Sequence, residues 1–226
     1  MTVLIVQARL DSKRLAEKCL LSLGGRPLIF RVMEALASVN CDAKVLACPE
    51  DCIEAFSPLA EEAGFELIPG PKEDVLARYC LVIRRFHADR VIRATGDNPF
   101  VFTDAAETLN EEAIALGADY SAYSGLPYGS AVESIHSEAL FRAEQEAQSV
   151  YERENVCPYL YSHPEFFRLH RPFAPRRWQG ADMRVTVDTE EDFRRACTLF
   201  NALSSLSPSE RNQGAVITAA YRSCNL

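Results

Sequence analysis

The feature that most constrains the fold is the run from Thr2 to Gln7, which is β-branched and apolar without polar alternation. A strand of this kind is expected to be covered on both faces, as in a parallel sheet lined by helices. The run ends directly in a loop that carries Arg9, Arg14 and Lys18. The opening of the chain therefore predicts a buried strand whose carboxyl end meets a group of cations.

The pattern of strand followed by helix repeats up to about residue 118. Strands are expected at residues 44–48, 65–68 and 90–94, and helices at residues 27–38, 53–63, 74–86 and 103–116, the last capped by Thr103. Alternating strands and helices with short links predict an α/β fold with a doubly wound, mainly parallel sheet. In such a sheet, ligands bind beyond the carboxyl ends of the strands.

The pattern changes after Asp119. Strands are expected at residues 120–123, 132–136, 166–171 and 183–187, helices at 137–147 and 151–162, and a final helix after Asp188. This half is predicted to add a smaller antiparallel portion to the sheet. Since no repeat, low-complexity tract or long linker is present, we expect one domain over residues 1–226, with halves at about 1–118 and 119–226.

The chain is acidic, with 24 Lys and Arg against 32 Asp and Glu and a net charge of -8. A general attraction to nucleic acid or to an anionic membrane is therefore not expected. The segment up to Arg31 nevertheless contains six basic and only two acidic residues. This local excess predicts an anion site, although a solvated surface turn would have the same composition.

The eight cysteines form no C-x-x-C pair, and several occupy apolar positions. They indicate small buried side chains in a reducing compartment. A zinc site at Cys48 and Cys52 is disfavoured because the histidines are distant in sequence. The first apolar run is too short for a signal peptide or a membrane span, so a cytoplasmic location is expected.

The basic loop suits a phosphate ligand, because backbone N–H groups and cationic side chains at a strand end can hold several phosphate oxygens at once. Neither G-x-G-x-x-G nor G-x-x-x-x-G-K-[ST] follows the strand, which disfavours dinucleotide-binding and Walker-type sites. A triphosphate held by Arg9, Arg14 and Lys18 is the favoured interpretation.

Two carboxylates follow other predicted strands. Asp97, in Thr95-Gly96-Asp97-Asn98-Pro99, lies in a tight turn that suits a ligand of Mg²⁺, which is usually bound by one or two carboxylates plus phosphate oxygens. Asp188 could share that metal from another strand end. Ordinary turn chemistry and helix capping also explain these residues when each is taken alone.

Several segments together resemble one family. QARLDSKRLAEKCL resembles its Q-A-R-x-G-S-x-R-L-P-G-K-x-L, DVLARYCLVIRRFHADRVIRATGDNPF resembles its D-V-L-x-R-Y helix leading to R-x-T-G-D-x-P, and ENVCPYL and MRVTVDTEEDF resemble its E-x-V-T-P-Y and R-x-T-V-D-T-x-E-D. The segment YGSAVESIHSEAL also matches, and the matches continue in order to about residue 203. The chain is similar to the cytidylyltransferases of the spore-coat polysaccharide type, which resemble CMP-Kdo synthetase.

This resemblance implies a nucleotide-diphospho-sugar transferase fold and a Mg²⁺-dependent enzyme. Such an enzyme condenses CTP with a sugar or sugar-acid acceptor to give a CMP-sugar and pyrophosphate, for surface polysaccharide or glycan synthesis. It also implies a homodimer formed through the second half, which would be the acceptor and dimerisation half, whereas the first half would bind the nucleotide.

The same resemblance assigns roles by motif. Arg14, Lys18 and Asp97 would be catalytic, and Asp97 and Asp188 would bind the metal. Glu133 and Tyr128 would belong to the acceptor site. The nucleotide would be bound by Ala8, Arg9, Ser12, Arg14, Lys18, Arg78 and Thr95.

The chain departs from the family pattern at Asp11, Ala16 and Glu17 of the basic loop, and at Tyr128 and Ala131 where the family often has acids. A carboxylate about 4 Å from a phosphate oxygen would cost about 4 kcal/mol at an effective dielectric near 20. Either Asp11 turns outward, pairs with Lys13 or Arg14, or joins the metal site, or the loop no longer binds CTP in the usual pose. A glycosyltransferase of related fold and a catalytically degenerate nucleotide-binding protein remain as alternative functions.

Two further predictions concern the second half. His136 lies three residues after Glu133 on an expected strand, hence on the opposite face, and is interpreted as structural. Arg176, Arg177 and Trp178 form either a mobile flap over the acceptor or an ordinary surface loop.

Overall fold

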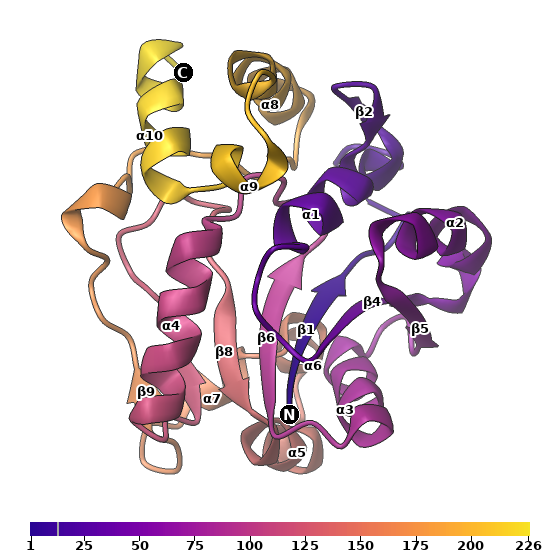
Figure 1. Ribbon diagram of the computed structural model, residues 1–226. Helices are drawn as coiled ribbons and strands as arrows, with labels where there is room; N and C mark the ends of the chain where they lie inside the picture. The colour runs from indigo at the N-terminus through magenta and orange to yellow at the C-terminus, as the bar shows by residue number, and fades with distance from the viewer. Residues whose placement is uncertain (13) are drawn as a thin grey trace.

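The computed structural model describes residues 1–12 and 14–226, and these fold around a seven-stranded sheet with the strand order β5-β4-β1-β6-β8-β7-β9 (Figure 1). A two-stranded hairpin of β2 and β3 lies outside it. The strands are β1 (Thr2–Gln7), β2 (Ser22–Leu23), β3 (Arg26–Pro27), β4 (Ala43–Pro49), β5 (Glu66–Gly70), β6 (Arg90–Thr95), β7 (Tyr120–Ser121), β8 (Glu133–His136) and β9 (Leu169–His170).

The large sheet is mixed, and its parallel part comes from the first half of the chain. Strands β5, β4, β1 and β6 are parallel neighbours, whereas β8 runs antiparallel to both β6 and β7. In the register of β1 and β6, Gln7 lies opposite Thr95, so the loops that follow these two strands start at the same level. The prediction of a mainly parallel sheet with a smaller antiparallel portion is confirmed.

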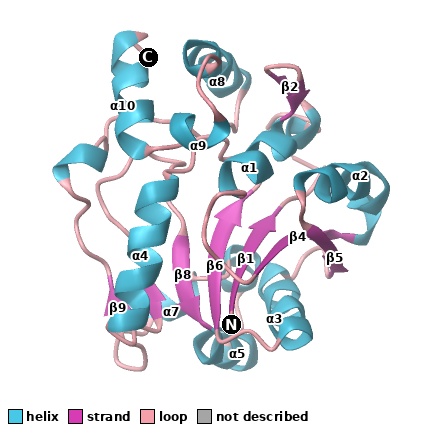
Figure 2. Ribbon diagram, viewed as in Figure 1, coloured by secondary structure: helices cyan, strands magenta, loops and turns pink. Residues whose placement is uncertain are grey.

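Helices cover both faces of this sheet (Figure 2). They are α1 (Leu28–Leu36), α2 (Ile53–Ala63), α3 (Val75–Phe86), α4 (Thr103–Ala115), α5 (Ser137–Glu146), α6 (Val150–Asn155), α7 (Pro158–Ser162), α8 (Glu190–Leu203), α9 (Pro208–Arg211) and α10 (Gly214–Ser223), with short 3₁₀ turns η1 (Lys18–Leu20), η2 (Glu50–Cys52) and η3 (Arg176–Trp178). No helix in the described part of the chain is both long and apolar enough to cross a membrane.

The first strand shows why the fold is layered. Successive strand side chains point to opposite faces. Leu4 and Val6 belong to the core shared with α1, α2, α4 and the C-terminal helices, whereas Val3 and Ile5 belong to the core shared with α3, α5 and α7. All four side chains are fully buried, which explains the absence of polar alternation in the sequence.

The predicted elements of the first half match the structure closely, with one correction. Thr103 is the first residue of α4 rather than its cap, and its hydroxyl donates to the carbonyl oxygen of Asn212 instead of to its own helix. The cap position is taken by Phe102, whose side chain makes no capping hydrogen bond.

The second half departs further from prediction. Residues 183–187 form no strand, since among the described residues their β-pairing is one isolated bridge between Tyr128 and Arg184. The helix expected at 151–162 is interrupted at Val156, which has a φ of 73°. The helix expected after Asp188 starts after Thr189, and it is not the last one, because α9 and α10 follow.

Candidate functional site

A cavity of about 810 Å³ opens at the carboxyl ends of β1 and β6, where the fold predicts a ligand site. The basic loop, the TGDN turn after β6 and η1 line it. The loop over residues 122–133, the end of α6, and Thr186 and Asp188 also contribute to the lining. Segments far apart in the sequence therefore share one cavity.

The close approach of the first two loops depends on Gly96. Its backbone N–H donates to the carbonyl oxygen of Gln7 at 2.8 Å. A Cβ at this position would lie 2.8 Å from the Cβ of Ala8 and 2.8 Å from a methyl carbon of Ile29, closer than packed atoms allow. Only a glycine lets the turn after β6 lie against the start of the basic loop.

Four side chains singled out from the sequence meet at this rim. Lys18 Nζ lies 2.7 Å from Asp97 Oδ2 and 2.9 Å from Asp188 Oδ1. An Nη2 atom of Arg14 lies 2.8 Å from the same Asp188 oxygen. The Lys18 side chain is only 12% exposed, whereas that of Arg14 is 65% exposed, so the lysine forms the buried centre of the group. We call Arg14, Lys18, Asp97 and Asp188 the rim cluster.

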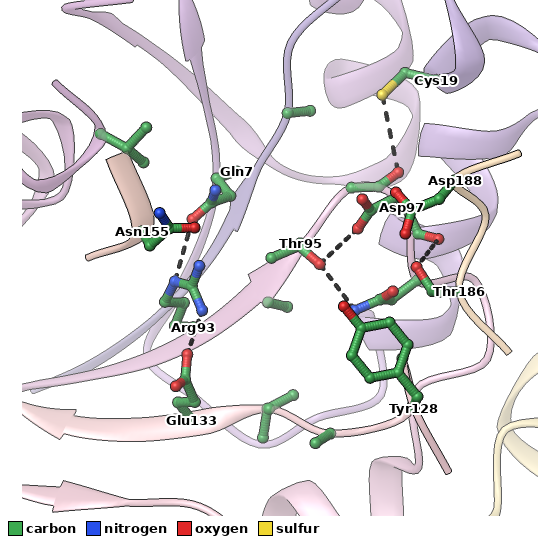
Figure 3. A pocket seen from close by; sticks show the side chains of 18 of the residues that line it. Gln7, Cys19, Arg93, Thr95, Asp97, Tyr128, Glu133, Asn155, Thr186 and Asp188 are labelled. Carbon is green, nitrogen blue, oxygen red and sulfur yellow. Dashed lines mark hydrogen bonds and ion pairs between the residues drawn. The ribbon is translucent and has the colours of Figure 1, made fainter. Parts of the chain in front are cut away.

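Neighbouring groups orient both carboxylates of the rim cluster. Thr95 donates its hydroxyl to Asp97 Oδ1 at 2.7 Å, and Val187 donates its backbone N–H to the carbonyl oxygen of Asp97 at 2.9 Å. Figure 3 shows Asp97 and Asp188 side by side, with Thr95 pointing toward Asp97. The two acids are thus connected through the backbone as well as through Lys18.

The electrostatics of the rim cluster favour its charged form. Burial raises the pKa of Asp188, but the hydrogen bond from Lys18 and the charges of Lys18 and Arg14 outweigh it, so the pKa lies below its usual value. Burial lowers the pKa of Lys18, and Asp97 and Asp188 more than reverse this, so its pKa is raised. The Asp188 carboxylate and the Lys18 ammonium are therefore both ionised near neutral pH.

The donor set of Asp97 and Asp188 fits a hard divalent cation. Both acids supply carboxylate oxygens, the ligand type that Mg²⁺ prefers, and both already lie against one cation, the Lys18 ammonium. No group of three or more His, Cys, Asp or Glu residues in the described chain could hold a metal by itself. A metal here would need further ligands from substrate phosphate oxygens.

Cys48 and Cys52 do not offer a better metal site. All eight cysteines are free, and burial raises the pKa of Cys48 to about 12 and that of Cys52 to about 11. Zinc binds the thiolate, which these two side chains form only at high pH.

The other residues predicted to bind the nucleotide are also found at the cavity. Ala8, Arg9, Ser12 and Thr95 all line it. Arg9 pairs with Glu154 of α6 at 3.1 Å, so the basic loop is tied to α6.

Asp11, the main departure in this loop, points elsewhere. Its carboxylate lies 3.2 Å from Lys72 Nζ and 3.6 Å from Arg9 Nε, and its side chain is 45% exposed. It is not among the described residues that line the cavity. The expected outward turn is observed, Arg14 pairs with Asp188 instead, and the alternative involving Lys13 lies outside the described residues.

Arg78 lines the cavity from α3 and is almost completely buried. Its Nη1 donates to the carbonyl oxygen of Pro71 at 3.3 Å, and its Nε has no hydrogen-bond partner in the described chain. Burial lowers its pKa. It is a buried guanidinium with unused donor capacity beside the cavity.

A second charged group lies at the same cavity, and sequence reasoning found only part of it. Arg93 of β6 lies directly opposite Glu133 of β8 in the antiparallel register, and the two form an ion pair. Arg93 Nε also donates to Gln7 Oε1 at 3.1 Å, and Glu133 accepts from the Tyr120 hydroxyl at 2.6 Å. We call Gln7, Arg93, Tyr120 and Glu133 the strand cluster; Figure 3 shows three of its members apart from Asp97 and Asp188, with Thr95 between.

Glu133 and Arg93 of the strand cluster are also both charged. Burial raises the pKa of Glu133, but the Arg93 charge and the hydrogen bonds from Tyr120 and Arg93 lower it overall. Arg93 and Gln7 were missed because each has an ordinary place in its strand. The available signal was a polar side chain at the same face position on each of three neighbouring strands.

Of the other residues singled out in the second half, Tyr128 lines the cavity, whereas Trp178 and His136 do not. Tyr128 stands at the cavity mouth with 62% of the residue exposed, and its ring lies 4.8 Å from the Arg184 guanidinium carbon. Neither alternative given for Trp178, a mobile flap or a surface loop, is correct, because this residue is fully buried and donates Nε1–H to Asp104 at 2.8 Å. His136 pairs with Arg90 in the sheet and is not among the described residues that line the cavity.

Comparisons with known proteins show the family to which this chain belongs. The family model described as cytidylyltransferase matches residues 3–221. The spore coat polysaccharide biosynthesis protein SpsF of Bacillus subtilis is 31% identical over 206 residues, which is 87% of this chain and 85% of that protein.

Two solved structures show the same fold. A cytidylyltransferase from Leptospira borgpetersenii superposes with a TM-score of 0.90 at 20% identity, over 98% of this chain and 94% of the other. A CMP:2-keto-3-deoxy-manno-octonic acid synthetase complexed with CTP superposes with a TM-score of 0.69 at 18% identity, over 91% of this chain and 99% of the other. With the family model spanning nearly the whole sequence, the chain belongs to the cytidylyltransferase family.

Proposed function

We propose that this chain is a Mg²⁺-dependent cytidylyltransferase that transfers CMP from CTP to a sugar or sugar-acid acceptor and releases pyrophosphate. The observation that carries the proposal is the rim cluster, in which Lys18 contacts Asp97 and Asp188 and Arg14 contacts Asp188. Cations for a triphosphate and carboxylates for a metal lie within one hydrogen-bonded group at the carboxyl ends of the strands.

Binding of the triphosphate would use the basic loop. Arg9, Arg14 and Lys18 supply cationic donors, and Ser12 supplies a hydroxyl at the same wall. Each charge-assisted hydrogen bond contributes about 1.5–3 kcal/mol net. Arg78, with its free donor capacity, lies on α3 where the nucleoside end of CTP would be received.

Transfer consists of attack by an acceptor oxygen on the α-phosphorus, with cleavage of the bond from that phosphorus to the bridging oxygen of the leaving pyrophosphate. Such a reaction needs orientation of the reactants and neutralisation of developing charge more than covalent participation by the protein. Arg14 and Lys18 would neutralise charge that accumulates on the pyrophosphate. Mg²⁺, held by Asp97 and Asp188, would supply Lewis-acid charge stabilisation when bound.

The acceptor would enter on the side of Tyr128 and the strand cluster. Glu133 is not expected to act as a general base there, because Arg93 and Tyr120 hold its carboxylate and lower its proton affinity. Its carboxylate and the Arg93 guanidinium would instead recognise acceptor hydroxyl groups by hydrogen bonds.

The test is release of pyrophosphate from CTP with Mg²⁺ across a panel of sugars, sugar phosphates and sugar acids. We expect release only with CTP, Mg²⁺ and an acceptor together, and a product that contains CMP. A glycosyltransferase would consume a sugar nucleotide without releasing pyrophosphate. A degenerate binding protein would bind CTP with Mg²⁺ and release no pyrophosphate with any acceptor.

We also propose a homodimer formed through the second half and a cytoplasmic location. Large apolar side chains are exposed there on α6 and on the segments that flank β9: Val150, Tyr151, Phe166 and Phe173. Light scattering at micromolar concentration that gives the mass of a single 25.2 kDa chain would exclude the dimer.

A further inference from the structure

Besides Asp188, the proposed metal ligand, the segment from Arg184 to Asp192 contains two charged side chains at its ends that have no role in the proposed function, Arg184 and Asp192. Asp188 presents its Oδ1 atom to Lys18 and Arg14 at the cavity rim. Its other oxygen, Oδ2, faces away from them and accepts a hydrogen bond from Arg184 Nη2 at 2.9 Å. Arg184 therefore determines which oxygen of Asp188 faces the cavity.

Arg184 is itself held by a second carboxylate. Its Nε donates to Asp192 Oδ1 at 2.8 Å and its Nη2 donates to Asp192 Oδ2 at 3.0 Å, a two-point contact that fixes the plane of the guanidinium. The side chain of Asp192 is only 4% exposed. We call Arg184 and Asp192 the clamp.

Asp192 also fixes the backbone that carries Asp188. It accepts hydrogen bonds from the backbone N–H groups of Asp188 and Thr189, each at 3.1 Å, and forms a capping box with Thr189 at the start of α8. Arg195 adds a further donor at 2.9 Å. The carboxylate of Asp192 therefore holds the backbone of Asp188 directly and the side chain of Asp188 through Arg184.

The path of residues 183–188 does not depend on the clamp alone. Val185 donates its N–H to the carbonyl oxygen of Tyr128 at 2.8 Å, and Val187 donates to that of Asp97 at 2.9 Å. Gly129, with a φ of 95°, lets the Tyr128 loop approach, since a Cβ there would lie 2.5 Å from the Thr186 nitrogen. Because these backbone contacts locate the segment, the Arg184 guanidinium is left to orient the Asp188 carboxylate.

We propose that Arg184, held by Asp192, is a positioning residue that keeps Oδ1 of Asp188 directed at the metal position. The inference rests on the proposed function, in which Asp188 is a metal ligand. Arg184 also lies under the Tyr128 ring, so the same guanidinium links the acceptor side of the cavity to the carboxylate.

The test compares Arg184→Gln with Arg195→Gln. Both variants remove one arginine from Asp192, but only Arg184 contacts Asp188. Mn²⁺ binding is measured by electron paramagnetic resonance with saturating CTP, after subtraction of Mn²⁺ bound by CTP alone. Loss of a residue that orients a metal ligand costs about 10–100-fold in metal affinity, so R184Q should bind Mn²⁺ at least about tenfold more weakly than R195Q.

A merely structural role would lower the melting temperature of both variants and leave their Mn²⁺ affinities equal, which would overturn the proposal. Arg184→Lys, which keeps the charge but not the two-point contact, should recover part of the affinity and serves as the second variant if R184Q fails to fold. Binding of CTP without metal should stay within about twofold in all three, since the clamp does not touch the basic loop.

The readout separates this inference from the proposed function. If the wild-type chain binds Mn²⁺ and R184Q binds it weakly, but no acceptor supports pyrophosphate release, the clamp stands and the proposed transferase activity fails. If the wild-type chain binds no Mn²⁺ with CTP present, both are overturned.

Discussion

The rim cluster and the strand cluster line the same cavity, yet they are held in different ways. The rim cluster joins Lys18, Asp97 and Asp188, which come from three loops or turns and meet through one ammonium group. In the strand cluster, Arg93 and Glu133 are paired across adjacent strands, and Gln7 and Tyr120 complete their hydrogen bonds. An ammonium can exchange its partners easily, whereas a guanidinium fixed on a sheet cannot.

The difference separates two tasks that charged side chains perform in one site. In the rim cluster, we expect the ion pairs between Lys18 and the two carboxylates to break when a ligand binds. In the strand cluster, we expect the ion pair between Arg93 and Glu133 to persist, so that it forms a permanent wall against which the ligand lies. Substitutions should therefore affect binding and turnover at the rim, and stability at the strands.

The largest effect is expected for Asp97→Asn, which keeps the size of the side chain and removes its charge. Turnover should fall by about 10³-fold, at the upper end for the loss of one electrostatic stabiliser, while the chain remains folded. Pyrophosphate release and circular dichroism measure the two quantities. Asp182→Asn, at an exposed acid of the second half, serves as the control and should retain activity. Equal activity in the two variants would remove Asp97 from the rim mechanism.

Glu133→Gln should instead act on stability. It leaves Arg93 without its counter-charge in a largely buried position, and breaking a buried ion pair by removing one partner costs about 3 kcal/mol. Denaturant unfolding with and without Arg93→Met gives the coupling energy of the pair. If Glu133→Gln unfolds at the wild-type denaturant concentration, the strand cluster is not a permanent wall.

Lys18→Met tests whether the Lys18 ammonium, unlike the Arg93 guanidinium, can be replaced by a metal ion. Loss of charge-assisted hydrogen bonds worth about 2 kcal/mol should weaken CTP binding by about 30-fold. In the nucleotide-free protein, Mn²⁺ affinity should rise, because Asp97 and Asp188 lose the ammonium that neutralises them. Calorimetry measures both affinities, and Arg93→Met should leave the Mn²⁺ affinity unchanged. Weaker Mn²⁺ binding in Lys18→Met would contradict the idea that a metal takes the place of the Lys18 ammonium beside Asp97 and Asp188.

Acid should lower the free energy of unfolding by protonating Asp188 and Asp192. The pKa of both is lowered by their cationic and hydrogen-bonding neighbours despite burial, so their contribution is present above the unfolded-state value of about 3.9 and is lost as the pH falls through the folded value. At pH 7, Asp192→Asn should cost about 2 kcal/mol, less than a fully buried pair, since Arg184 and Arg195 are partly exposed. Urea unfolding at pH 7 and at pH 2.5 should show the gap between variant and wild type narrowing at the lower pH; a constant gap would contradict this origin.

The smallest effect is expected for Asp11→Gly. Asp11 is half exposed and paired with Lys72 and Arg9 outside the cavity lining, so CTP affinity should change by no more than about threefold, in the range of an exposed ion pair. A strong gain in affinity would mean that the native loop has lost function. Lys72→Gln is the matched control, because it removes the same pair from the other side.

The parallel half of the fold could be predicted from the sequence because each element there carries its own local signal. The apolar run at Thr2–Gln7 and the glycine after Ala63 define β1 and the end of α2 without tertiary information. The meeting of the basic loop with Asp97 followed from a general rule, that residues after parallel strands meet at one edge of the sheet. The contact of Lys18 with Asp97 agrees with it, whereas Asp188 reaches Lys18 from a segment that forms no strand.

The second half could not be predicted as well because its structure depends on contacts distant in sequence. Residues 183–187 alternate like a strand, but they bond to loops at Tyr128 and Asp97 instead of to a strand. Trp178, next to two arginines, looked like part of a mobile surface, yet Asp104 and the start of α10 enclose it. Arg93 gave no local signal, since its role comes from the strand beside it.

The pairing of cations with acids inside the cavity has a consequence for selectivity. Arg9, Arg14, Lys18 and Arg93 all have carboxylate partners, and Arg78 alone among the described cations that line the cavity has none, so the cavity offers little net attraction to a bare anion. A free sulfate or inorganic phosphate ion would have to break these pairs and would leave acids without counter-charge. The cavity therefore selects ligands that bring positive charge together with negative charge, and buffers rich in simple anions should compete with such ligands only weakly.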